Sequence, residues 1–194
     1  MRVIQILPQL NIGGVERGTL DLSKALIEQG HESFVISGGG ILVDELIRSG
    51  AKHYEIPVHI KSLRTLYLAK SLSEKISSID PDIVHIRSRM PAWVNYRAFK
   101  MLKKKPLLIS TFHGLYSFPI YSKVMSFVDH SIAISKTVER YILENYRLDK
   151  DDITVIPRGC DPIEFNNNVI NPADKANIIE AVSYTHLRAH ETPV

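Results

Sequence analysis

The chain has 194 residues, a length that favours one well-packed domain over two full ones. Its net charge of +3, from 24 basic and 21 acidic side chains, is too small to indicate a nucleic-acid partner. A single cysteine excludes an intrachain disulfide, and no stretch approaches the ~20 apolar residues of a membrane helix. The first apolar run is too short for a signal peptide. We therefore expect a soluble, cytoplasmic protein.

Strand-like and helix-like segments are expected to alternate along the chain. Residues 2–7 form an apolar run typical of a buried strand, and a helical pattern then begins at Val15 and stops at Gly30. The next elements are a strand at 33–37, a helix at 41–49, a strand at 52–56, a helix at 63–79, a strand at 83–86, a helix at 92–103, strands at 107–111 and 131–134, a helix at 136–145 and a strand at 153–156. This alternation predicts an α/β fold with a mostly parallel sheet and helices on both faces.

Two aspartates flank a proline between the helix at 63–79 and the strand at 83–86. Asp80 and Asp82 superficially resemble a carboxylate pair for Mg²⁺. They precede a strand, however, whereas ligands of open parallel sheets bind beyond the carboxyl ends of the strands. Pro81 also ends the helix. We therefore interpret this segment as a helix stop and strand entry.

A glycine pair joins the first strand to the first helix. Gly13 and Gly14 let backbone approach a ligand closely, and the helix start offers N–H groups and a positive dipole end to an anion. Glu16 complements the same dipole, and that structural role is sufficient for it. The glycine spacing does not fit G-x-G-x-x-G, and no Lys-Ser or Lys-Thr follows it. Nicotinamide, flavin and P-loop chemistry are therefore disfavoured.

Other polar residues also follow predicted strands. They should lie with the glycine pair along the carboxyl ends of the strands, an edge called the rim below. Arg87 and Arg89 can pair with a phosphate or carboxylate, whereas Trp93 is interpreted as a packing residue. His113 can donate a hydrogen bond to a sugar hydroxyl, act in acid–base chemistry, or simply cap its loop. His85, inside an apolar strand, is interpreted as a packed core histidine.

Taken in order, these loops resemble the N-terminal half of a GT-B glycosyltransferase of the family-4-like group. The resemblance covers roughly residues 1 to 170 and is strongest with bacterial lipopolysaccharide-type members. The matching segments are Asn11-Ile12-Gly13-Gly14-Val15-Glu16, Arg87-Ser88-Arg89-Met90-Pro91-Ala92-Trp93, Ser110-Thr111-Phe112-His113-Gly114, Ile132-Ala133-Ile134-Ser135, and Ile156-Pro157-Arg158-Gly159-Cys160-Asp161 followed by Phe165.

The resemblance implies a Rossmann-like domain and a retaining hexosyltransferase-type enzyme. Such enzymes move a sugar from a nucleotide-diphosphate donor to a glycan or lipid-linked acceptor in cell-envelope polysaccharide synthesis, without a cofactor or bound metal. The acceptor docks on the N-terminal domain, in contact with the inner face of the membrane, and the C-terminal domain holds the donor nucleotide.

The resemblance also implies roles for particular residues. Gly13 and Gly14 would face the diphosphate and the reacting sugar, and His113 would contact the transferred sugar as the catalytic residue. The remaining expected donor- or acceptor-binding residues are Glu16, Arg87, Arg89, Ser135 and, near the hinge, Arg158.

The resemblance divides the chain into three parts. Residues 1–165 are expected to be the family-4-like N-terminal domain and 166–181 the start of an interdomain connection. Residues 182–194 look like a translated adapter sequence and are expected to be non-native. We expect the chain to lack the C-terminal domain and to be inactive alone. A non-catalytic module that binds a sugar, a lipid-linked glycan or a protein partner is the alternative. A nucleotide-sugar epimerase would need a Tyr-x-x-x-Lys motif, which is absent.

Overall fold

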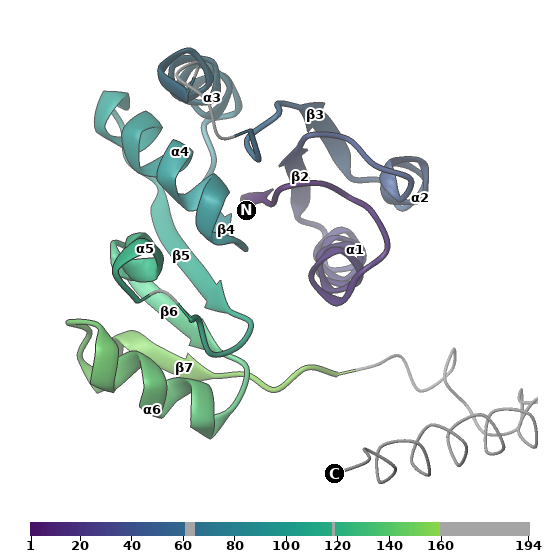
Figure 1. Ribbon diagram of the computed structural model, residues 1–194. Helices are drawn as coiled ribbons and strands as arrows, with labels where there is room; N and C mark the ends of the chain where they lie inside the picture. Colours follow the sequence, from purple (N-terminus) through teal and green to yellow (C-terminus); the bar gives the residue numbers. More distant parts are fainter. Residues whose placement is uncertain (61–64, 118, 160–194) are drawn as a thin grey trace, which may run out of the picture. The chain divides into compact units, whose positions relative to one another are not determined.

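The computed structural model describes residues 1–60, 65–117 and 119–159 (Figure 1). The chain divides into two compact units, Met1–Pro157 and Arg158–Val194. The expected connection at 166–181, the expected tail at 182–194 and the first two residues of the helix predicted at 63–79 lie outside the described residues. No helix in the described part of the chain is long and apolar enough to cross a membrane.

The first unit is built on one parallel sheet of seven strands in the order β3-β2-β1-β4-β5-β6-β7. The strands are β1 (Arg2–Ile6), β2 (Glu32–Ser37), β3 (Lys52–Glu55), β4 (Ile83–Ile86), β5 (Leu107–Phe112), β6 (His130–Ala133) and β7 (Ile153–Val155). The helices are α1 (Gly14–Glu28), α2 (Val43–Arg48), α3 (Thr65–Ile79), α4 (Arg89–Met101), α5 (Pro119–Ser122) and α6 (Lys136–Asn145), with 3-10 turns η1 (Lys123–Ser126) and η2 (Lys150–Asp152). The predicted α/β fold is confirmed.

The largest deviation from the predicted boundaries is in α4, which begins at Arg89 rather than at residue 92 and ends at Met101 rather than at 103. Ser88 is extended and forms the N-cap, so Pro91 falls in the first turn. A proline is tolerated there because the first backbone N–H groups of a helix have no partner within the helix. The short α5 and η1 carry too few residues for a periodic signal and were not predicted.

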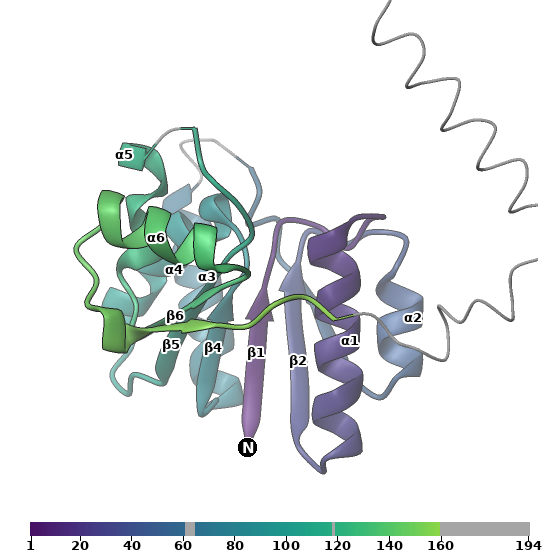
Figure 2. The ribbon, with the colours of Figure 1, turned by 90° about the horizontal axis from the view of Figure 1, so that it is seen from below.

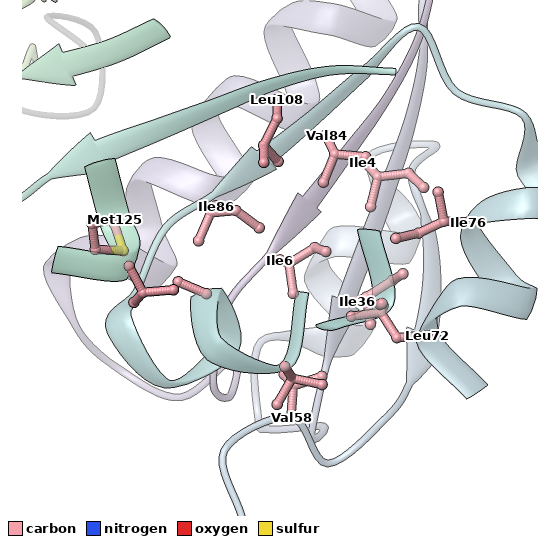
Figure 3. Packing of buried hydrophobic residues seen from close by; sticks show 14 of the residues in the cluster. Ile4, Ile6, Ile36, Val58, Leu72, Ile76, Val84, Ile86, Leu108 and Met125 are labelled. Atoms are coloured by element: carbon pink, nitrogen blue, oxygen red, sulfur yellow. The ribbon is translucent and has the colours of Figure 1, made fainter. Parts of the chain in front are cut away.

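Apolar side chains fill the space on both faces of the sheet. Alternate residues of the central strands, among them Ile4, Ile36 and Val84, pack against Leu72 and Ile76 of α3, and all five are buried (Figure 3). A second cluster lies on the α1 and α2 side and consists of Leu7, Leu10, Leu20, Val35, Leu46 and Ala51. Figures 1 and 2 accordingly show α1 and α2 on one side of the sheet and α3 and α4 on the other.

The strand order reverses next to β1. The chain runs outward from β1 through β2 to β3 and then returns to place β4 on the other side of β1. The loops that follow β1 and β4 therefore diverge, and open sheets of this kind bind ligands in the crevice at that switch point. Gly13 and Gly14, called the glycine turn below, follow β1, and Arg87 follows β4. Both segments therefore lie at the switch point.

The aspartates of the helix stop have structural partners. Asp80, the only described non-glycine residue with a positive φ, accepts hydrogen bonds from Lys104 (2.7 Å) and Arg2 (3.3 Å). Asp82 accepts from the backbone N–H of Arg2 at 2.7 Å. Both carboxylates thus join the end of α3 and the start of β4 to their neighbours, as the helix-stop interpretation requires.

Candidate functional site

The glycine turn leads directly into α1. Gly14 is the first helical residue and Gly13 the N-cap, with an extended φ of 175° that any residue could adopt. A Cβ on Gly13 would meet the Glu16 carboxylate, which lies at the end of a flexible side chain that can move aside. Glu16 therefore folds back over the helix start, which agrees with the structural role expected for it at a positive dipole end.

A second glycine segment, Gly38-Gly39-Gly40 after β2, supports the loop between β1 and α1. The Leu10 N–H donates to the Gly39 carbonyl at 2.7 Å, and the Gly38 N–H donates to the Pro8 carbonyl at 2.9 Å. Gly40 has a φ of +138°, and a Cβ on it would lie 2.8 Å from the Leu10 backbone nitrogen. This segment therefore contacts the backbone of Pro8 and Leu10, in the loop that leads from β1 to Gly13. These three glycines match no motif, so the sequence by itself gave them no role.

A histidine that the sequence did not single out also lies at this rim. The His59 ring rests on Gly38, where a Cβ would lie 2.5 Å from its Nδ1 atom. That Nδ1 atom is buried and has no hydrogen-bond partner within the described ranges. His59 lies after β3 in a turn without a recognisable motif, so no sequence signal could have identified it.

Arg87 lies deeper than a rim cation was expected to lie. Its side chain faces the α1 side of the sheet, is 6% exposed, and donates from Nη1 to the Gln5 Oε1 at 3.0 Å. On the same face, the His85 Nε2 is hydrogen-bonded to the Thr111 Oγ1 at 2.7 Å. The core interpretation of His85 is therefore confirmed.

His113 follows β5 directly, is partly exposed, and lies near this buried group. Burial lowers the pKa of His85 well below its ordinary value, and the charges of Arg87 and His113 lower it further. The His85 ring is hydrogen-bonded to Thr111, two residues before His113 in the chain, and Arg87 follows His85 by two residues. The structure thus brings together two of the predicted site residues at the carboxyl ends of β4 and β5.

Arg89 lies in an aromatic group instead. Its guanidinium carbon is 4.6 Å from the ring centre of Tyr116 and 5.8 Å from that of Tyr121, a cation–π arrangement. Trp93 donates from Nε1 to the Tyr121 carbonyl at 3.0 Å and packs against the core, as its packing interpretation expected. Two strongly exposed apolar side chains, Leu115 and Ile120, lie near this group in the chain.

The last two predicted residues have distinct positions. Ser135 is the N-cap of α6, and its hydroxyl accepts a hydrogen bond from the Val138 N–H at 3.2 Å. This role accounts for its position after β6. Arg158 is exposed and is the first residue of the second unit.

Lowering the pH below 6.5 is expected to destabilise the first unit through His85. Its pKa is lower in the folded chain than the ordinary value of 6.5, so the unfolded chain binds more protons between the two values. The stabilisation is complete above 6.5 and falls by up to about 1.4 kcal/mol per pH unit as the pH drops through that window. Burial also lowers the pKa of half-buried His53.

Urea unfolding of the wild type and of His85→Gln, at about pH 7.5 and about pH 5.5, measures this effect. Glutamine retains a hydrogen-bonding group for Thr111 but does not titrate. The free energy of unfolding of His85→Gln should therefore depend less on pH. An equal dependence in both proteins would assign the effect to other groups.

The fold defines the class of protein as a Rossmann-like α/β domain, with the candidate site at the switch point between β1 and β4. A family model of Glycosyltransferase Family 4 matches residues 12–164, and the chain belongs to this family. The resemblance seen in the ordered loops is thereby confirmed.

Solved structures agree with this assignment. A glycosyltransferase from Rickettsia africae ESF-5 is 36% identical, with a TM-score of 0.72 over 94% of this chain and 49% of that chain. Anabaena Alr3699/HepE, in complex with UDP-glucose, has a TM-score of 0.72 at 14% identity over 94% of this chain and 50% of that chain. WaaB, a lipopolysaccharide outer core galactosyltransferase, has a TM-score of 0.65 at 18% identity over 83% of this chain and 46% of that chain. The last two show the fold alone.

One curated relative is human. It is one of the subunits of the phosphatidylinositol N-acetylglucosaminyltransferase of Homo sapiens. This relative is 25% identical over 185 residues, which cover 87% of this chain and 38% of that protein. The chain thus spans about half the length of these solved relatives and less of the human one.

Proposed function

We propose that this chain is the acceptor-side domain of a retaining, hexosyltransferase-type enzyme. The enzyme transfers a sugar from a nucleotide-diphosphate donor to a glycan or lipid-linked acceptor in cell-envelope polysaccharide synthesis. The observation that carries the proposal is that partly exposed His113 and buried Arg87 follow the carboxyl ends of the adjacent strands β5 and β4. Membership of the family supports it, as do neighbours whose names include UDP-glucose and lipopolysaccharide.

The proposed chemistry assigns separate tasks to this group. Breaking the glycosyl–phosphate bond builds negative charge on the leaving diphosphate, which fixed cations and helix dipoles stabilise. The α1 start at Gly13 and Gly14 and the Arg87 guanidinium provide such charge on this domain. His113 hydrogen-bonds a hydroxyl of the transferred sugar. No metal or cofactor has a part in this scheme, and the donor nucleotide binds to a C-terminal half like that of the longer relatives.

The acceptor is proposed to approach across an apolar part of the rim. The exposed fractions of Ile12 after β1, and of Ile120 in α5, are 85% and 90%, and Leu115 after β5 is 60% exposed. Exposed apolar side chains of this kind suit a lipid-linked acceptor at the inner face of a membrane. The lysines at 103–105 precede β5 instead, and Lys104 is paired with Asp80. We therefore place the membrane contact at the rim, with the enzyme in the cytoplasm.

A transfer assay with nucleotide sugars tests the proposal. The 194-residue chain alone should show no transfer above background, because the donor-binding half is needed. A longer gene product, which continues past residue 181 into a C-terminal donor-binding domain, is called the read-through gene product. It should transfer sugar to a lipid-linked or glycan acceptor. Appreciable transfer by the chain alone would contradict the division of tasks. Glycan binding by the longer product without transfer would favour the non-catalytic binding module.

A further inference from the structure

We infer that Gln5 is a positioning residue for sugar transfer, because it fixes the direction of the Arg87 guanidinium at the switch point. The inference rests on the proposed function. Gln5 lies on β1, beside His85 of β4 in the sheet register, and its side chain is fully buried. A glutamine in a central strand is unusual among the apolar residues around it, so its hydrogen bonds need an explanation.

The amide of Gln5 is held in one orientation. Its Nε2 donates to the Thr19 carbonyl at 3.1 Å and to the Ser23 hydroxyl at 2.9 Å, both on α1. An amide nitrogen has two N–H groups, so these two acceptors use both of them. The Oε1 must then face away from α1, and it accepts from the Arg87 Nη1 at 3.0 Å. A flipped amide would place its N–H groups against the guanidinium and its oxygen against a carbonyl.

The hydrogen bonds continue beyond Gln5. The Ser33 hydroxyl of β2 donates to the Ser23 hydroxyl at 3.0 Å. The group therefore links β2, α1, β1 and the end of β4 through buried side chains. The same α1 begins at the glycine turn. Gln5 therefore connects the helix that begins at Gly14 to the guanidinium of Arg87.

The direction of the guanidinium matters because the charge of Arg87 is buried. Electrostatic interactions in a buried environment are screened weakly and depend strongly on distance. Arginine donors also bind anions through a rigid fork, so a rotated guanidinium would present different N–H groups to a diphosphate. Gln5 thereby affects transfer through Arg87 without touching the substrate.

A kinetic comparison in the read-through gene product tests the inference. Gln5→Met keeps the length of the side chain but removes all three hydrogen bonds, and kcat should fall at least about tenfold, the scale of one charge-assisted hydrogen bond. Ser33→Ala is the matched control, since it removes a buried hydrogen bond of the same group that does not involve Gln5. Its kcat should stay within about twofold of the wild type. Thermal unfolding of both variants gives the correction for loss of folded protein.

A double-mutant cycle separates positioning from a general loss of stability. If Gln5 acts through Arg87, then Gln5→Met should lower kcat little further in the Arg87→Met background. A second tenfold decrease in that background would overturn the inference, as would an unchanged kcat in Gln5→Met alone.

A readout on the 194-residue chain does not depend on activity. In the wild type and in Ser33→Ala, the Arg87 guanidinium should give restrained, slowly exchanging nitrogen signals by nuclear magnetic resonance. Gln5→Met should broaden or shift these signals. Unchanged signals would overturn the inference whether or not transfer is detected. Absence of transfer in the wild-type read-through product, with the signals changing as expected, would instead count against the proposed function.

Discussion

Replacing His113 with alanine is expected to lower the turnover of sugar transfer about 100-fold or more in the read-through gene product. His113 follows β5 and is partly exposed, with its Nε2 atom buried, so its removal opens space at the edge of the core and not inside it. The loss should therefore appear in kcat, while the free energy of unfolding changes by less than about 1 kcal/mol. Steady-state kinetics with a nucleotide sugar and urea unfolding measure the two effects.

His130→Ala provides the matched control for this experiment. His130 begins β6 at the opposite end of the strand from the rim and is hydrogen-bonded to the Thr154 hydroxyl at 2.8 Å. Its loss removes a histidine and one hydrogen bond without affecting the candidate site, so turnover should not change. If His113→Ala had unchanged kinetics as well, His113 would return to the loop-capping role.

Gly40→Ala is expected to lower the free energy of unfolding by about 3 kcal/mol and to abolish most transfer activity. Two effects combine at this position. The φ of +138° strains any residue with a Cβ, and the added Cβ would overlap the backbone of Leu10. Backbone cannot move aside as a flexible side chain can, so the loop that carries Gly13 and Gly14 must shift.

Gly30→Ala separates these two effects. Gly30, after α1, also has a positive φ, +75°, but a Cβ there would meet nothing within 4 Å. Its substitution should therefore cost about 1 kcal/mol, the strain alone, and leave transfer unchanged. Urea unfolding and transfer rates of the two variants give the comparison. A Gly40→Ala variant no less stable than Gly30→Ala would show that the loop accommodates the methyl group.

Local patterns were sufficient to predict most of the fold. The apolar run at 83–86 and the helical pattern at 136–145 gave the observed bounds of β4 and α6, because such patterns are properties of short segments. The helix predicted at 92–103 begins three residues earlier, at Arg89, and Pro91 fits the first turn of a helix. The four-residue α5 was missed because it is shorter than the period it would have to show.

The candidate site was only partly predictable. The end of each parallel strand indicated which loops share a rim, so the glycine turn, Arg87 and His113 could be named from the chain alone. What each side chain does there depends on partners far away in sequence. Arg87 donates a hydrogen bond to Gln5, 82 residues earlier, and Arg89 lies over the ring of Tyr116, which follows β5 in the chain. Neither contact has a local signature.

The sequence by itself determined the order of the elements, the parallel sheet and, through the order of its loops, the membership in Glycosyltransferase Family 4. Those properties follow from periodicity and motifs, which are written along the chain. Only the tertiary structure decided that Arg87 is buried and hydrogen-bonded to Gln5, and that Gly40 lies against the backbone of Leu10. Strand register and loop packing set these contacts, and both depend on how segments distant in the chain fit together in space.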